Sequence, residues 1–217
     1  MKRVSRYVGV LMAVMLGMGV MSAQAASQSP HEVVSQSVEK LMSRLDNNQD
    51  RYRNHPDELK SVVEQNIDPI VDWRYASASV MGKYFQAASP EQRSRFARVF
   101  KQTLIDTYAQ GLVTFDYKDV RVLDDQNQRY EDQASVDMEV IAAGGERYPV
   151  SYTLRDRDGS WKVINVVVNG INLGLTFRNQ FDQAMRANNR DFDSVINGWA
   201  PDVDLKDGDG DNQKAQS

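Results

Sequence analysis

The sequence predicts an α+β fold, in which a helical region is followed by a four-stranded antiparallel sheet and then by further helices. Apolar residues recur at helical spacing over residues 31–111. They alternate with polar residues at strand spacing over 113–169, and they return to helical spacing over 171–199. Separate runs of helices and strands are typical of α+β proteins. Residues 26–203 are therefore predicted to form one domain of this class.

The first 25 residues have the pattern of a cleaved secretory signal. Basic residues in MKRVSRY precede the apolar run VGVLMAVMLGMGVM, and Ala23 and Ala25 supply the small residues that a signal peptidase requires. An uncleaved membrane anchor is the alternative, but the apolar run is shorter than the roughly 20 residues that cross a bilayer. We therefore expect cleavage after Ala25 and a soluble mature protein outside the cytoplasm.

Charge and composition disfavour several classes of function. The chain has 26 basic and 30 acidic residues, and Lys2, Arg3 and Arg6 leave with the signal, so the mature net charge is near −7. This balance argues against nucleic acid or an anionic membrane surface as the main partner, because both select basic patches. Cysteine is absent, which leaves neither a disulfide nor a thiolate site.

The acidic tail, residues 204–217, resembles a calcium loop only in part. Asp207, Asp209 and Asp211 match positions one, three and five of an EF-hand loop. Asn212 stands where the loop requires Gly, and no Glu follows at position twelve. We expect a disordered polar terminus instead.

Four helices are expected before the sheet, over 31–53, 55–67, 72–88 and 89–112, and two after it, over 173–187 and 192–199. The helix at 89–112 is the best defined. Ser89 is its predicted N-cap, Pro90 suits the first helical position, and Gln92 completes a capping box.

Three strands are read from alternation and turn signals. SVDMEVI (135–141) and RYPVSYTL (147–154) alternate cleanly, and Gly-Gly at 144–145 and Asp-Gly at 158–159 are hairpin turns. The first strand, TFDYKDVRVL (114–123), changes phase between Tyr117 and Val120, as a β-bulge would cause.

The fourth strand, WKVINVVV (161–168), is apolar on both faces. Its simple alternation places Trp161, Val163 and Val167 on one face. Ile164, Val166 and Val168 then lie on the other face. A surface strand of an antiparallel sheet normally has one polar face, so this strand requires cover on both sides.

The sequence offers little catalytic chemistry. It has two histidines, His31 and His55, and no GxSxG elbow, HExxH motif or Gly-rich phosphate loop. A carboxylate base in an apolar pocket is the remaining route, but Asp137 and Glu139 alternate toward solvent. We predict no catalytic residues, no metal site and no cofactor.

Two interpretations of the apolar residues stay open: a filled core, or a wall of a cavity between sheet and helices. Side-chain periodicity does not distinguish them, since apolar residues line both. If a cavity exists, the sequence places the following residues around it: Val80, Tyr84, Phe100, Leu104, Tyr108, Met138, Val140, Val150, Tyr152, Ile164, Val166, Val168 and Ile171.

The stretch DWRYASASVMGKYFQAASPEQRSRFARVFKQTL resembles the MlaC family, also called toluene-tolerance auxiliary proteins. It fits the pattern A-x-x-V-(L/M)-G-x-(Y/W)-x-x-A-(S/T)-P-x-Q-R. Trp161, Gly170 and FRNQF at 177–181 continue the resemblance, which covers roughly residues 31–203. The chain departs from the family pattern at Asn165, Asn169 and Asn172, where relatives often carry acidic or small hydroxyl residues.

The resemblance implies a monomeric periplasmic phospholipid carrier rather than an enzyme. Such carriers move lipid between an outer-membrane complex of MlaA and a porin and an inner-membrane ABC transporter that contains MlaD, and they help to maintain outer-membrane lipid asymmetry. Their sheet is NTF2-like, and acyl chains lie between it and a helical subdomain. The competing hypotheses are an NTF2-like enzyme that uses Tyr152 with an acidic neighbour, and an adaptor with no ligand.

Overall fold

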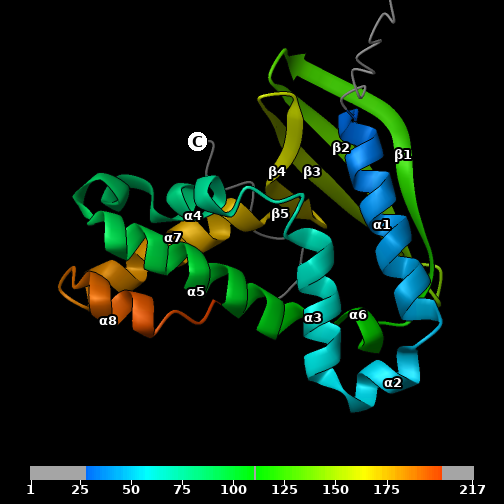
Figure 1. Ribbon diagram of the computed structural model, residues 1–217, viewed down its shortest axis with the longest axis horizontal. Coiled ribbons are helices and arrows are strands. Elements are labelled where there is room, and N and C mark those ends of the chain that lie inside the picture. Colours follow the sequence, from blue (N-terminus) through cyan, green and yellow to red (C-terminus); the bar gives the residue numbers. More distant parts are fainter. Residues whose placement is uncertain (1–27, 110, 202–217) are drawn as a thin grey trace, which may run out of the picture.

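A computed structural model describes residues 28–109 and 111–201 of the protein (Figure 1). The predicted signal segment, 1–25, and the predicted tail, 204–217, lie outside these residues. In the part that is described, no helix combines the length and the apolar character that crossing a membrane requires.

The element order confirms the α+β class, with helices on both sides of the strands in the sequence. The first group of helices is α1 Pro30–Asp46, α2 Gln49–Asn54, α3 Pro56–Ile67, α4 Trp73–Met81, the 3-10 helix η1 Gly82–Ala87, α5 Pro90–Tyr108 and α6 Gly111–Thr114. The strands are β1 Tyr117–Tyr130, β2 Gln133–Ala142, β3 Arg147–Arg157, β4 Ser160–Val168 and β5 Ile171–Asn172. The last helices are α7 Leu173–Ala187 and α8 Phe192–Asn197.

The strands form one antiparallel sheet in the order β1-β2-β3-β4-β5, so it has five strands where the sequence predicted four. The extra strand, β5, is a two-residue strand that returns from β4 through Asn169 and Gly170. Both turn residues have positive φ, +50° and +81°, as a tight two-residue hairpin turn requires. A strand of two residues is too short to show alternation, which is why the sequence pattern missed it.

A β-bulge in β4 overturns the predicted division of its two faces. Val163 pairs with Leu154 and Asn165 with Thr153, so Ile164 is an extra residue in the ladder. The shift brings Trp161 and Val163 onto the face that carries Val166 and Val168. The predicted bulge in β1 is confirmed by a register shift between Tyr117 and Asp119.

The bulged strand is also covered at its outer edge. The N–H of Val163 donates to the carbonyl of Ile70 at 2.7 Å, and its carbonyl accepts from the N–H of Asp72 at 2.9 Å. These bonds join the segment before α4 to the sheet and occupy backbone groups that an open edge would leave unpaired.

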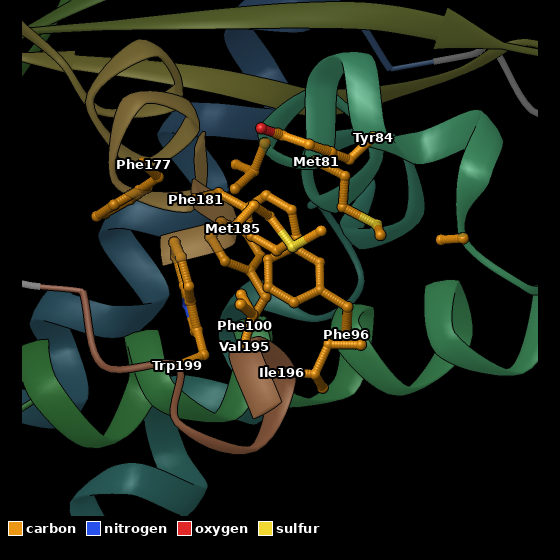
Figure 2. Close-up of a cluster of buried hydrophobic side chains, with 12 residues drawn as sticks. Met81, Tyr84, Phe96, Phe100, Phe177, Phe181, Met185, Val195, Ile196 and Trp199 are labelled. Carbon is orange, nitrogen blue, oxygen red and sulfur yellow. The ribbon is translucent and has the colours of Figure 1, made fainter. Parts of the chain in front are cut away.

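The helices form two groups around the sheet (Figure 1). Helix α1 lies along the sheet, and a cluster that includes Val33, Val34, Val136, Leu154 and Val163 joins them. Helices α4, α5, α7 and α8 pack together beside the sheet and form a helical subdomain. Its core is aromatic, with the following side chains pointing toward one another (Figure 2): Phe96, Phe100, Phe177, Phe181 and Trp199.

The capping box predicted for α5 is confirmed. The N–H of Gln92 donates to Ser89 Oγ at 3.2 Å, and the N–H of Ser89 donates to Gln92 Oε1 at 3.0 Å. Pro90 occupies the first turn, where its missing N–H costs nothing. These bonds fix the start of the helix that carries Phe96 and Phe100 into the subdomain core.

Candidate functional site

A cavity of about 990 Å³ lies between the sheet and the two groups of helices. Its walls come from α1, α3, α4, α5, α6, the first turns of α7, and strands β1 to β5. This volume is at the upper end of the range that is usual for small-molecule sites, about 300–1,000 Å³. The protein therefore contains the cavity that the sequence left as one of two alternatives.

Most residues predicted to surround a cavity do line it. The exceptions are Tyr84 and Ile171. The lining residues among those predicted are Val80, Phe100, Leu104, Tyr108, Met138, Val140, Val150, Tyr152, Ile164, Val166 and Val168.

Tyr84 lines the neighbouring groove rather than this cavity, because α4 ends earlier than its apolar pattern suggests. Gly82 has φ +53°, which ends the α-helix, and the chain continues as the 3-10 helix η1. The change of pitch turns Tyr84 away from the cavity face that carries Val80. Its ring packs on Phe181, with centroids 6.1 Å apart, and its hydroxyl donates to Asp182 Oδ1 at 2.8 Å.

Ile171 was placed wrongly because of the tight turn before it. The chain reverses at Asn169 and Gly170, so Ile171 pairs with Val168 at the edge of the sheet and is half-buried outside the cavity wall.

Sequence reasoning missed the contribution of the first helices and of α7. The apolar stripe of α1 was recognised, but a stripe has the same spacing whether it meets a core or a cavity. The residues that line the cavity but were not predicted to do so include Val34, Val38, Leu41, Ile67, Ile70, Trp73 and Phe177.

The cavity wall is almost free of charge. Among the described residues that line it, none is Asp, Glu, Lys or His, and Arg178 is the only residue with a formal charge. One of its few polar side chains, the buried Asn66, donates from Nδ2 to the carbonyl and to Oγ of Ser37 at 3.0 and 2.8 Å. Proton transfer to or from a substrate requires an ionisable group within hydrogen-bond reach, and this wall offers no carboxylate or imidazole.

Tyr152 shows how the cavity changes a side chain's surroundings. Burial raises the pKa of its hydroxyl to about 12, although part of its surface is accessible. The accessible part of Tyr152 faces the cavity, which this residue lines. The hydroxyl lies 4.0 Å from Met138 Sδ, and no described carboxylate pairs with it. The carboxylate–tyrosine constellation that an NTF2-like enzyme would need is therefore not formed here.

The three asparagines that depart from the family pattern have structural roles at the joint between β4 and α7. Asn165 Oδ1 accepts from the N–H of Gly174 at 3.1 Å, and Asn172 Oδ1 accepts from the N–H of Leu175 at 3.0 Å as N-cap of α7. Asn169 takes the left-handed conformation of the turn. Within residues 28–109 and 111–201, His, Asp and Glu side chains do not gather in groups of three that could hold a metal ion.

The family model described as MlaC protein matches residues 35–201. The chain belongs to the MlaC family. Among curated members, the toluene tolerance protein ttg2D of Pseudomonas putida is 39% identical over 179 residues, which is 82% of this chain and 83% of that one. The intermembrane phospholipid transport system binding protein MlaC of Haemophilus influenzae is 24% identical over 174 residues, 79% of this chain and 81% of its own length.

A solved structure shares the fold. It is a phospholipid-binding protein from Ralstonia solanacearum in complex with a phospholipid, with a TM-score of 0.70 and 22% identity, covering 78% of this chain and 94% of that one. The sequence-based recognition of the MlaC family is thus confirmed, and so is the fold class.

Proposed function

We propose that the protein is a soluble periplasmic carrier of phospholipids and is not an enzyme. The observation that carries the proposal is the cavity of about 990 Å³, whose wall is largely apolar and, among the described residues, includes one charged side chain, that of Arg178. The family supports the same proposal, because one member is named for intermembrane phospholipid transport and the structure of a similar protein was solved in complex with a phospholipid.

The proposed cargo explains why the wall is apolar. A diacyl lipid has about 30 methylenes, each costing about 0.8 kcal/mol to expose to water. The total cost of exposing the acyl chains, roughly 24 kcal/mol, exceeds the practical limit of non-covalent affinity, near 18–21 kcal/mol. The cavity exchanges lipid with a bilayer interior that is equally apolar, so the transfer is nearly balanced and the carrier both loads and unloads.

The proposed route follows the family. The carrier exchanges lipid with an outer-membrane complex of MlaA and a porin and with an inner-membrane ABC transporter that contains MlaD, which helps to maintain outer-membrane lipid asymmetry. Residues 1–25 direct export and are removed after Ala25, and the mature acidic chain does not adhere to anionic membranes.

Native mass spectrometry of protein purified from the periplasm tests the proposal. We expect adducts of phospholipid mass, and solvent extraction should release lipids with mixed headgroups, because the apolar cavity receives the acyl chains and the headgroup stays at its edge. The same protein after delipidation, and after re-exposure to vesicles, is the control. A bare mass in both the purified and the re-exposed sample would contradict the carrier function.

A further inference from the structure

Arg178 lies between two spaces of different character. It lines the apolar cavity, and it also lines a neighbouring groove of about 580 Å³. Tyr75 and Ser79 are likewise shared by both spaces. The groove carries polar side chains that the cavity lacks, namely Lys83, Gln86, Asn179 and Asp182. Arg178 therefore marks the boundary at which the apolar wall ends.

The end of α4 holds the Arg178 side chain in this position. Nε of Arg178 donates to the carbonyl of Ser79 at 2.7 Å. A methyl group on Gly82 would lie 3.4 Å from Cγ and Cδ of Arg178, so the stem rests against this glycine. One of the guanidinium's donors is thus used to orient it. In the part of the chain that is described, Arg178 has no carboxylate within ion-pair distance of its terminal nitrogens.

The carboxylate nearest along α7 is already engaged. Asp182, one turn after Arg178, lies 2.6 Å from Lys83 Nζ and also pairs with Arg186, and it accepts from the Tyr84 hydroxyl. Its partners compensate its charge, so among the described residues Arg178 is a charged side chain on the cavity wall with no carboxylate partner.

We propose that Arg178 binds the phosphodiester of a phospholipid whose acyl chains occupy the cavity and whose polar substituent lies in the groove. This inference rests on the proposed carrier function. A guanidinium donates two parallel hydrogen bonds to phosphate oxygens, and its apolar stem suits a boundary position. The phosphodiester is common to all phospholipid classes, so this contact fixes the depth of the lipid without selecting its headgroup.

The test compares two ligands with identical acyl chains, phosphatidylcholine and diacylglycerol, presented to delipidated protein in the same neutral detergent micelles. We expect the wild type to bind phosphatidylcholine about tenfold or more tightly than diacylglycerol, as a charge-assisted hydrogen bond would provide. Arg178→Met keeps the stem and removes the charge. It should remove this preference while it leaves diacylglycerol binding within about twofold of the wild type.

The control is Arg98→Met, because Arg98 is exposed on α5 and lines neither space; it should retain the full preference. Millimolar inorganic phosphate should not displace phosphatidylcholine, and displacement would show a site for free anions instead. Equal wild-type affinity for both ligands would overturn the role of Arg178, and this comparison does not depend on the folding of any variant. A wild type that binds neither ligand would overturn the carrier function itself.

Discussion

Asn165 Oδ1 accepts a hydrogen bond from the backbone N–H of Gly174 at 3.1 Å, which ties the bulged part of β4 to the first turn of α7. The start of a helix leaves its first N–H groups without partners. Asn165 satisfies one of them and the N-cap Asn172 satisfies the next, at Leu175. These two side chains join the sheet wall of the cavity to the helical subdomain, so both asparagines are part of the architecture.

Gly174→Ala is expected to loosen this joint. A methyl group at Gly174 would overlap the Asn165 side-chain oxygen, and relieving the overlap breaks the hydrogen bond between them. We expect the free energy of unfolding to fall by about 1–3 kcal/mol, measured by urea unfolding of lipid-free protein. Gly111→Ala is the control, because a methyl group there meets nothing within 4 Å; an equal loss in both variants would contradict the explanation.

The sequence predicted most of the helices and strands, with the two-residue β5 as an exception, but it did not predict the geometry between them. The capping box of Ser89 and Gln92 is local, so three residues of spacing predicted the start of α5 correctly. The prediction of which β4 residues share a face was wrong because of the bulge at Ile164. Pairing with β3 and the backbone hydrogen bonds of Val163 with Ile70 and Asp72 fix this bulge. Such tertiary contacts leave no trace in the alternation of a single strand.

The cavity itself shows the same limit. Val38 and Leu41 have the spacing of an ordinary core stripe, and only the placement of α1 relative to the sheet decides that they face an open space. The position of Tyr84 outside the cavity has a local cause in the sequence. Gly82 interrupts the helix between Val80 and Tyr84, so the two residues do not share one face.

Ser89→Ala removes the side-chain cap of α5 and should lower the free energy of unfolding by about 1 kcal/mol, within the usual range of about 0.5–2 kcal/mol for such caps. Denaturant unfolding of lipid-free protein measures the loss. Ser94→Ala lies exposed in the same helix and should be neutral or slightly stabilising, because alanine is the better helix former. A loss at Ser94 as large as at Ser89 would refute the capping argument.

Asp182→Asn is expected to lower the melting temperature in a pH-dependent way. Hydrogen bonds from Lys83 and Tyr84 lower the pKa of Asp182 to about 2, well below the usual value of an aspartate side chain. Because the folded pKa is the depressed one, the ionised carboxylate stabilises the fold above about pH 4, and this contribution disappears as the pH falls toward 2. The difference in melting temperature between the wild type and Asp182→Asn should therefore be present at pH 7 and should become smaller below pH 4.

Asp158→Asn serves as the matched control for this titration. Asp158 precedes Gly159 in the hairpin turn, where Asn-Gly is as favourable as Asp-Gly. At pH 7 its melting temperature should match that of the wild type, because the turn is preserved. If the melting temperature of Asp182→Asn stays below that of the wild type by the same amount down to pH 2, the lost stability comes from packing rather than from charge.

Val168→Trp tests whether the sheet face of the cavity carries ligand. Val168 lines the cavity and is only half-buried, so a larger side chain can extend into open space rather than into neighbours. The added volume displaces roughly two methylenes of an acyl chain, which are worth about 0.8 kcal/mol each, so lipid affinity should fall on the order of tenfold. Val136→Trp is the contrasting change, because Val136 is 1% exposed, does not line the cavity and packs in one cluster with Val34 and Leu154. It should instead cost the lipid-free fold about 1–3 kcal/mol through overpacking. Thermal melts of delipidated variants and quantification of bound lipid separate the two effects. If both variants are equally destabilised and Val168→Trp does not selectively lose bound lipid, this wall does not contact the cargo.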